Sequence, residues 1–217
     1  RTARAVADFY HEGQKENAHV LAFATAAVRS AANGGDFCAL VRQMCGLNVD
    51  VISGEEEALL GLSGALGHSD GGMIDIGGAS TEICIRRGGE IVFSVSLPIG
   101  AVRILEQCGQ DPRKIRAFVE DALHSLHGIC GPAQMYAIGG TASTLASIRL
   151  GLSEYDAKKL NGLSLPRDWL SEISGRLLSL PVEERKKIPG MDLRRADVIA
   201  GAAVLLSAAV EKLPLPE

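Results

Sequence analysis

The stretch that decides the fold is Gly72-Met73-Ile74-Asp75-Ile76-Gly77-Gly78-Ala79-Ser80-Thr81-Glu82-Ile83-Cys84-Ile85. It predicts a hairpin, because two alternating runs are joined by small residues. Gly77 and Gly78 lack a Cβ and can adopt positive φ, so backbone amides at this turn can converge on an anion. Strand alternation brings Asp75 and Glu82 to the mouth of the loop. Since Mg²⁺ prefers one or two carboxylates with water and phosphate oxygens, the stretch suggests a phosphate loop with a metal site; an ordinary glycine hairpin is the alternative.

The composition is that of an ordinary globular protein. The chain has 217 residues, 47% hydrophobic and 22% charged, which is enough for one large or two modest domains. No run approaches the roughly 18 apolar residues that a membrane span needs, and the N-terminus lacks the apolar core of a signal peptide. Five cysteines in no metal-ligand spacing favour reduced thiols and a cytoplasmic location. The formal net charge of −4 gives no support to DNA binding.

Upstream of the hairpin, helices and strands alternate as in a layered α/β fold. We expect helices at residues 2–16, 26–30 and 36–45 and strands at 19–24 and 49–52. Arg29 lies in the short helix, which Thr25 is expected to cap. Arg29 is a candidate for lining a phosphate cleft, and a solvent-facing arginine is the alternative.

The next predicted helix opens with Glu55, Glu56 and Glu57. Acids in a first turn complement the helix dipole and the unpaired amides, which is a structural reason for all three. Glu57 also shares a face with Gly61 and Gly64, and small residues let a helix approach another element or a ligand closely. A catalytic role for Glu57 therefore stays open.

A second anion site is predicted where a strand at residues 135–138 turns through Gly139-Gly140-Thr141 into a helix. Such a helix start presents free amides and the positive end of the dipole to a phosphate. The segment lacks the GxxxxGK of a P-loop and the third glycine of a dinucleotide fingerprint, so neither class is indicated.

Helices are expected over most of the remaining chain, after a strand at 90–97 that extends the hairpin into a meander. The predicted helices span 101–107, 112–127, 166–180, 181–188 and 196–210. His124 and His127 are spaced to bind a metal, but no third ligand is near in sequence, and we interpret them as surface histidines.

The order of five motifs resembles one family. The motifs are Ala24-Thr25-Ala26-Ala27-Val28-Arg29, Ile52-Ser53-Gly54-Glu55-Glu56-Glu57-Ala58, Asp75-Ile76-Gly77-Gly78-Ala79-Ser80-Thr81-Glu82, Gly139-Gly140-Thr141-Ala142-Ser143-Thr144-Leu145 and Arg195-Ala196-Asp197-Val198-Ile199. Together they are similar to the exopolyphosphatase and guanosine pentaphosphate phosphohydrolase family, Ppx/GppA. The resemblance implies the superfamily of acetate and sugar kinases, heat-shock ATPases and actin, an α/β fold with two ribonuclease-H-like domains and mixed sheets around a cleft.

The resemblance divides the chain into residues 1–53, the rest of a first domain, and 54–217, a second domain whose last helix is expected to pack back toward the first domain. The chain departs from the family pattern in three places. The family's first phosphate loop is expected upstream of Arg1, the C-terminal end looks short, and Ala79 stands where the family usually has a third glycine. We therefore expect a truncated enzyme.

The resemblance implies Mg²⁺-assisted hydrolysis of a terminal phosphoanhydride of polyphosphate or guanosine pentaphosphate. Glu57 is the candidate base that activates water, and Arg29 would steady phosphate. Asp75 and Glu82 would hold the metal. Amides near the two glycine turns would bind phosphates. These are Gly77, Gly78, Ser80, Gly139, Gly140 and Thr141.

Two other functions stay open. A sugar or acetate kinase of the same superfamily would share both phosphate loops but should carry a nucleoside pocket, and a non-catalytic phosphate or alarmone sensor would bind without turnover. No membrane or DNA partner is expected, and a homodimer is left open.

Overall fold

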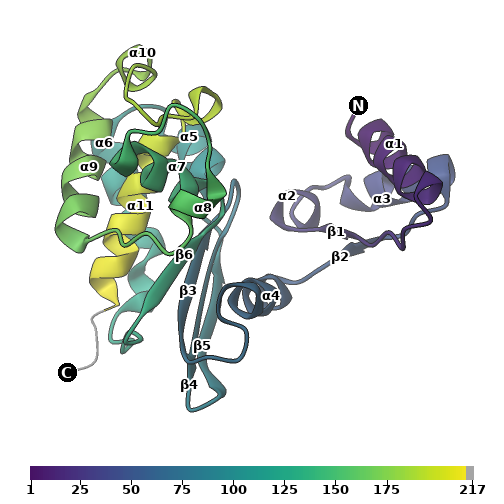
Figure 1. Ribbon diagram of the computed structural model, residues 1–217, viewed down its shortest axis with the longest axis horizontal. Helices are drawn as coiled ribbons and strands as arrows, with labels where there is room; N and C mark the ends of the chain where they lie inside the picture. The colour runs from purple at the N-terminus through teal and green to yellow at the C-terminus, as the bar shows by residue number, and fades with distance from the viewer. Residues whose placement is uncertain (214–217) are drawn as a thin grey trace. The chain divides into compact units, whose positions relative to one another are not determined.

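The computed structural model describes residues 1–213, and the chain divides into two units, Arg1–Glu57 and Ala58–Glu217 (Figure 1). Their assignment to two ribonuclease-H-like domains stays a prediction. Within residues 1–213 every helix is too short or too polar to cross a membrane.

The first unit is built on two short parallel strands, β1 (Ala22–Ala24) and β2 (Val49–Val51). Its helices are α1 (Thr2–Lys15), α2 (Ala26–Arg29) and α3 (Gly34–Cys45). Ala3 of α1, Val41 of α3 and Leu47 form its buried core. The strand, helix, strand order predicted here is confirmed, although Thr25 stands at the N-cap of α2 without a side-chain capping bond.

The second unit contains a four-stranded mixed sheet in the order β5-β4-β3-β6. The strands are β3 (Gly71–Ile76), β4 (Thr81–Arg87), β5 (Glu90–Leu97) and β6 (Met135–Ile138). The first three form the predicted antiparallel meander, and β6 is parallel to β3. This confirms the hairpin around which the sequence was interpreted.

Both faces of the sheet are covered, which explains why β3 and β4 are buried almost throughout. One face carries Ile74 and Ile83 into the main core. The other carries Met73 against Leu62 of α4 (Gly54–Leu66). A Cβ on Gly61 would lie 2.8 Å from Met73 Cε, so this small residue lets α4 approach the sheet.

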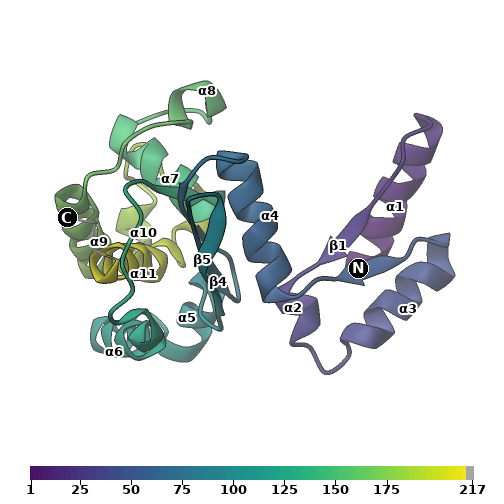
Figure 2. The same cartoon turned by 90° about the horizontal axis from the view of Figure 1, so that it is seen from below.

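Helices of the second unit surround α11 (Ile199–Lys212), which is buried along most of its length. Figures 1 and 2 show α11 in yellow beside α9 (Arg167–Ser179), and it also packs on α5 (Ala101–Cys108), α6 (Pro112–Ala122) and α7 (Gly139–Leu150). Two short helices, α8 (Ala157–Leu160) and α10 (Val182–Arg185), lie in the connections.

The helix expected at 112–127 is shorter than predicted. Asp111 caps its start by accepting bonds from the amides of Arg113 and Lys114, but α6 ends at Ala122. A 3-10 turn, His124–Leu126, follows and places Leu123 and Leu126 in the core. A second 3-10 turn, Leu193–Arg195, precedes α11, which begins at Ile199 instead of at the predicted position 196.

Candidate functional site

The turn of the β3–β4 hairpin is held by its own backbone. Asp75 and Glu82 are direct cross-strand partners, so their side chains lie on the same face of the sheet, as predicted. The Gly77 N–H donates to the Ser80 carbonyl at 3.0 Å and closes the loop. The expected use of positive φ is wrong, because neither Gly77 nor Gly78 is among the positive-φ glycines of residues 1–213.

The glycines instead allow close approach to α5. The amides of Ala101 and Val102 donate to the carbonyls of Gly77 and Gly78, each at 2.9 Å. In a trans peptide the N–H points opposite to the preceding C=O, so the amides of Gly78 and Ala79 point away from α5. Helix α5 thus orients the loop, a role that the sequence interpretation missed and that Pro98-Ile99-Gly100 before the helix could have signalled.

Gly100→Ala is expected to displace this loop. A Cβ at Gly100 would lie 2.6 Å from the carbonyl carbon and oxygen of Gly78, and backbone atoms cannot move aside as a flexible side chain can. We expect the free energy of unfolding to fall by about 1–3 kcal/mol, measured by urea unfolding. Gly64→Ala is the control, since a Cβ there meets no atom within 4 Å and the helix gains propensity. An unfolding free energy for Gly100→Ala at or above that of the wild type would contradict the packing argument.

The second glycine turn lies beside the first. β6 ends at Ile138, and Gly139, with φ +77°, begins α7. Ile138, the N-cap residue of α7, makes no side-chain capping bond to the first turn of the helix. The Thr141 hydroxyl donates to the Ile76 carbonyl at 3.2 Å, and a Cβ on Gly139 would touch the Asp75 carboxylate. Both turns and Asp75 therefore meet at the carboxyl ends of β3 and β6.

Arg195 also reaches the start of α7. A Cβ on Gly140 would occupy the place of the Arg195 guanidinium, so the two groups are in close contact. Arg195 opens the last of the five family motifs, but it was not predicted as a site residue. A cation at the positive end of a helix dipole is unfavourable unless an anion binds there. Asp192 offsets part of this cost, because its Oδ2 lies 3.8 Å from Arg195 Nε.

A buried arginine fixes the segment that follows Arg195. Arg185, 1% exposed, donates to the carbonyls of Leu177 at 2.7 Å and Ala196 at 3.3 Å and to Gln110 Oε1 at 2.7 Å. Gln110 in turn donates to the Asp197 carbonyl at 2.8 Å. Burial lowers the pKa of Arg185. This network was missed from the sequence because its members lie far apart in the chain.

The two candidate metal ligands differ in burial. Glu82 is 1% exposed and accepts a hydrogen bond from the Ser96 hydroxyl at 2.7 Å, whereas Asp75 is half-buried. Carboxylates placed directly opposite each other repel unless a cation or a proton lies between them. No group of three or more His, Cys, Asp or Glu side chains in residues 1–213 is arranged to hold a metal. A pair of carboxylates beside phosphate-binding turns nevertheless fits Mg²⁺, which keeps several water and phosphate ligands. His124 and His127 are exposed, as interpreted from the sequence.

The first unit brings Arg29 and Glu57 together. Arg29 Nη1 donates to the Ile52 carbonyl at 2.7 Å and lies 3.4 Å from Glu57 Oε2, and both side chains are about a quarter exposed. Glu56 has a different role, because it accepts from the Ser53 amide at 2.7 Å while its own amide donates to Ser53 Oγ. This capping box lowers the pKa of Glu56. Of the acids that open α4, Glu56 therefore caps the helix and Glu57 faces an arginine.

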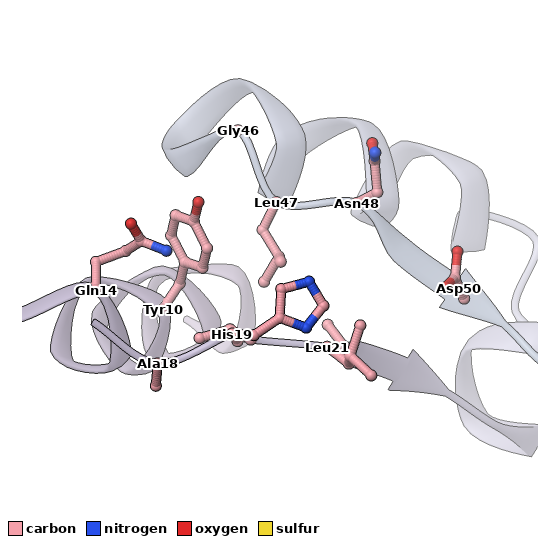
Figure 3. Close-up of a pocket in the computed structure, with 11 residues that line it drawn as sticks. Tyr10, Gln14, Ala18, His19, Leu21, Gly46, Leu47, Asn48 and Asp50 are labelled. Atoms are coloured by element: carbon pink, nitrogen blue, oxygen red, sulfur yellow. The ribbon is translucent and has the colours of Figure 1, made fainter. Parts of the chain in front are cut away.

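A pocket of about 410 Å³ also lies in the first unit (Figure 3). Residues from the end of α1, from 18–22 and from 46–50 line it, including Tyr10, His19 and Asp50. None of the predicted site residues contributes to its lining.

Comparisons with known proteins agree with the fold and the motifs. A sequence model of the Ppx/GppA phosphatase family matches residues 1–216. Exopolyphosphatase 2 of Mycobacterium tuberculosis is 30% identical over 98% of this chain and 73% of its own length. The guanosine-5'-triphosphate,3'-diphosphate pyrophosphatase of Vibrio cholerae is 32% identical over 87% of this chain and 39% of its own length. The crystal structure of the Aquifex aeolicus Ppx/GppA family member has a TM-score of 0.80 at 28% identity, covering 97% of this chain and 72% of that one. This likeness confirms the predicted fold class.

Proposed function

The chain belongs to the Ppx/GppA phosphatase family, and from this we propose that it hydrolyses the terminal phosphoanhydride bond of inorganic polyphosphate or of guanosine pentaphosphate. The observation that carries the proposal is the meeting of two glycine turns, Asp75 and Arg195 at one end of the second unit's sheet. Relatives named for each of the two substrates support it equally.

The glycine turns would bind phosphate oxygens through backbone amides. In the first turn, the N–H of Gly77 is used within the loop, which favours the amides of Gly78 and Ser80. In the second turn, the donors would be the amides of Gly139, Gly140 and Thr141, with the Arg195 guanidinium as a charged partner. Such fixed donors stabilise charge on phosphate oxygens without rearranging during the reaction.

Asp75 and Glu82 would hold Mg²⁺ beside these turns. Bound there, Mg²⁺ would offset the negative charge of the phosphate oxygens and of the two carboxylates. The two carboxylates would hold the ion through oxygen atoms from adjacent strands.

Glu57 would act as the general base. Its carboxylate takes a proton from water, the water oxygen bonds to the terminal phosphorus, and the bridging P–O bond breaks as the shortened phosphate chain leaves. Arg29 would orient the Glu57 carboxylate through their ion pair, and its guanidinium would donate to a phosphate oxygen. A phosphate or alarmone sensor would bind the same substrates through the same turns but would release no phosphate.

The test is phosphate release by the purified protein from polyphosphate and from guanosine pentaphosphate. Arg195→Ala is expected to raise KM for the better substrate about tenfold or more, because one charge-assisted hydrogen bond is lost. The matched control is Arg194→Ala, whose exposed guanidinium pairs with Asp192, and it should leave KM near the wild-type value. Tight binding of both substrates without phosphate release would indicate a sensor, and an equal effect of the two arginine variants would remove Arg195 from the site.

A further inference from the structure

A row of three polar residues crosses the sheet beside the phosphate turns. Asp75 on β3 is paired with Glu82 on β4, and Glu82 is paired with Ser96 on β5. Partners directly opposite each other in antiparallel strands point to the same face, so the three side chains form one line. The Ser96 hydroxyl lies at the end of this line and donates to Glu82 Oε1 at 2.7 Å.

We propose that Ser96 is a positioning residue that orients the Glu82 carboxylate for a divalent cation shared with Asp75. The proposal rests on the proposed function, in which Asp75 and Glu82 hold Mg²⁺. The terminal torsion of a glutamate is broad, so a carboxylate without a fixed donor can rotate among many orientations. A hydroxyl bonded to one oxygen restricts that rotation and leaves the second oxygen in a defined direction. Outer partners of this kind commonly affect metal affinity 10–100-fold.

Burial strengthens this argument. Glu82 is 1% exposed, and an ionised carboxylate removed from water requires hydrogen bonds or a cation. The Ser96 hydroxyl donates to Glu82 at 2.7 Å, and a hydrogen bond from a hydroxyl to a charged oxygen is stronger than one between neutral groups. Ser96 therefore supplies one of the hydrogen bonds that the buried Glu82 carboxylate requires.

Ser94 supplies an internal comparison on the same strand. It lies two residues before Ser96, faces the same side of the sheet and is paired with Cys84 instead of a carboxylate. Its Oγ is buried beside the Cys84 thiol and, within residues 1–213, makes no hydrogen bond to a carboxylate. A buried serine on this face therefore does not by itself bind a carboxylate. Ser96 does so because it is paired with Glu82.

The test is Mn²⁺ binding without substrate, with Mn²⁺ standing in for Mg²⁺ and free ion measured by electron paramagnetic resonance. Ser96→Ala is expected to weaken Mn²⁺ binding about 10–100-fold. Ser94→Ala, the matched control, should bind as the wild type does. Ser96→Thr, which keeps the hydroxyl, should restore binding relative to Ser96→Val, which has the same shape without it. This second pair keeps the test decisive if the cavity left by alanine disturbs the sheet.

Glu82→Gln separates the two levels of the proposal. If Glu82→Gln weakens Mn²⁺ binding but Ser96→Ala and Ser96→Val do not, the positioning role of Ser96 is overturned and the metal site stands. If Glu82→Gln also binds Mn²⁺ as the wild type does, the carboxylate pair is not the metal site and the proposed function loses that part. Loss in Ser96→Ala and Ser96→Val with retention in Ser96→Thr supports the proposal.

Discussion

Glu57→Gln is expected to slow the chemical step about 10²–10⁴-fold while the protein stays folded and still binds its substrate. Glutamine keeps the size of the side chain and a hydrogen-bonding oxygen but removes the carboxylate that would accept a proton from water. Substrate affinity should be kept or improve, because the side chain no longer carries a negative charge that would repel the substrate. Single-turnover phosphate release measures the chemical step, and a separate binding titration measures affinity.

The contact with Arg29 supports this expectation. Both side chains are partly buried, and Arg29 is anchored by its bond to the Ile52 carbonyl. In Glu57→Gln the arginine keeps that anchor, so its position should change little. A purely structural role predicts otherwise, because the loss would then be a small change in stability, about 0.3–1 kcal/mol, and activity would follow the folded fraction.

Glu56→Gln is the matched control on the same helix turn. A glutamine at this position can complete a capping box as glutamate does, so both the helix start and turnover should be retained. Wild-type turnover in Glu57→Gln would remove Glu57 as the base. An equal loss in both variants would show that the helix start, and not the base, had been disturbed.

Local patterns in the sequence were sufficient for most of the sheet of the second unit. Alternation over 72–85 predicted the hairpin, and a period of two residues is enough to predict that Asp75 and Glu82 share a face. The strand at 135–138 was predicted with its observed bounds, and a helix was predicted after it. Each of these features is determined by residues close together in the chain.

The parts that sequence reasoning missed depend on long-range packing. Gly140 and Arg195 are 55 positions apart, and only the folded chain places the guanidinium against the helix start. Glu55, Glu56 and Glu57 look equivalent in the sequence, and it is the positions of Ser53 and Arg29 that give two of them different partners. The prediction of positive φ at Gly77 was wrong for the same reason. Glycines suit this loop because α5 packs closely against it, which is a long-range contact.

The buried network around Arg185 leads to the second prediction with a large expected effect. Arg185→Met is expected to lower the free energy of unfolding of the second unit by about 2–5 kcal/mol. Methionine fills a similar volume but leaves the carbonyls of Leu177 and Ala196 without these donors. The loss of stability is reduced in part, because the variant no longer has to bury a charged guanidinium. The free-energy cost of that burial is also what lowers the pKa of Arg185.

Urea unfolding followed by fluorescence reports on the second unit, because the single tryptophan, Trp169, lies on α9. Arg176→Met, at an exposed position of the same helix, is the control and should change stability by less than about 0.5 kcal/mol. Gln110→Ala should be intermediate, since it removes the bond to the Asp197 carbonyl but leaves Arg185 bonded to Leu177 and Ala196. If Arg185 also fixes the segment that carries Arg195, the folded Arg185→Met protein will show a raised KM beyond its loss of folded fraction. An Arg185→Met protein as stable as Arg176→Met would show that the network contributes nothing to the fold.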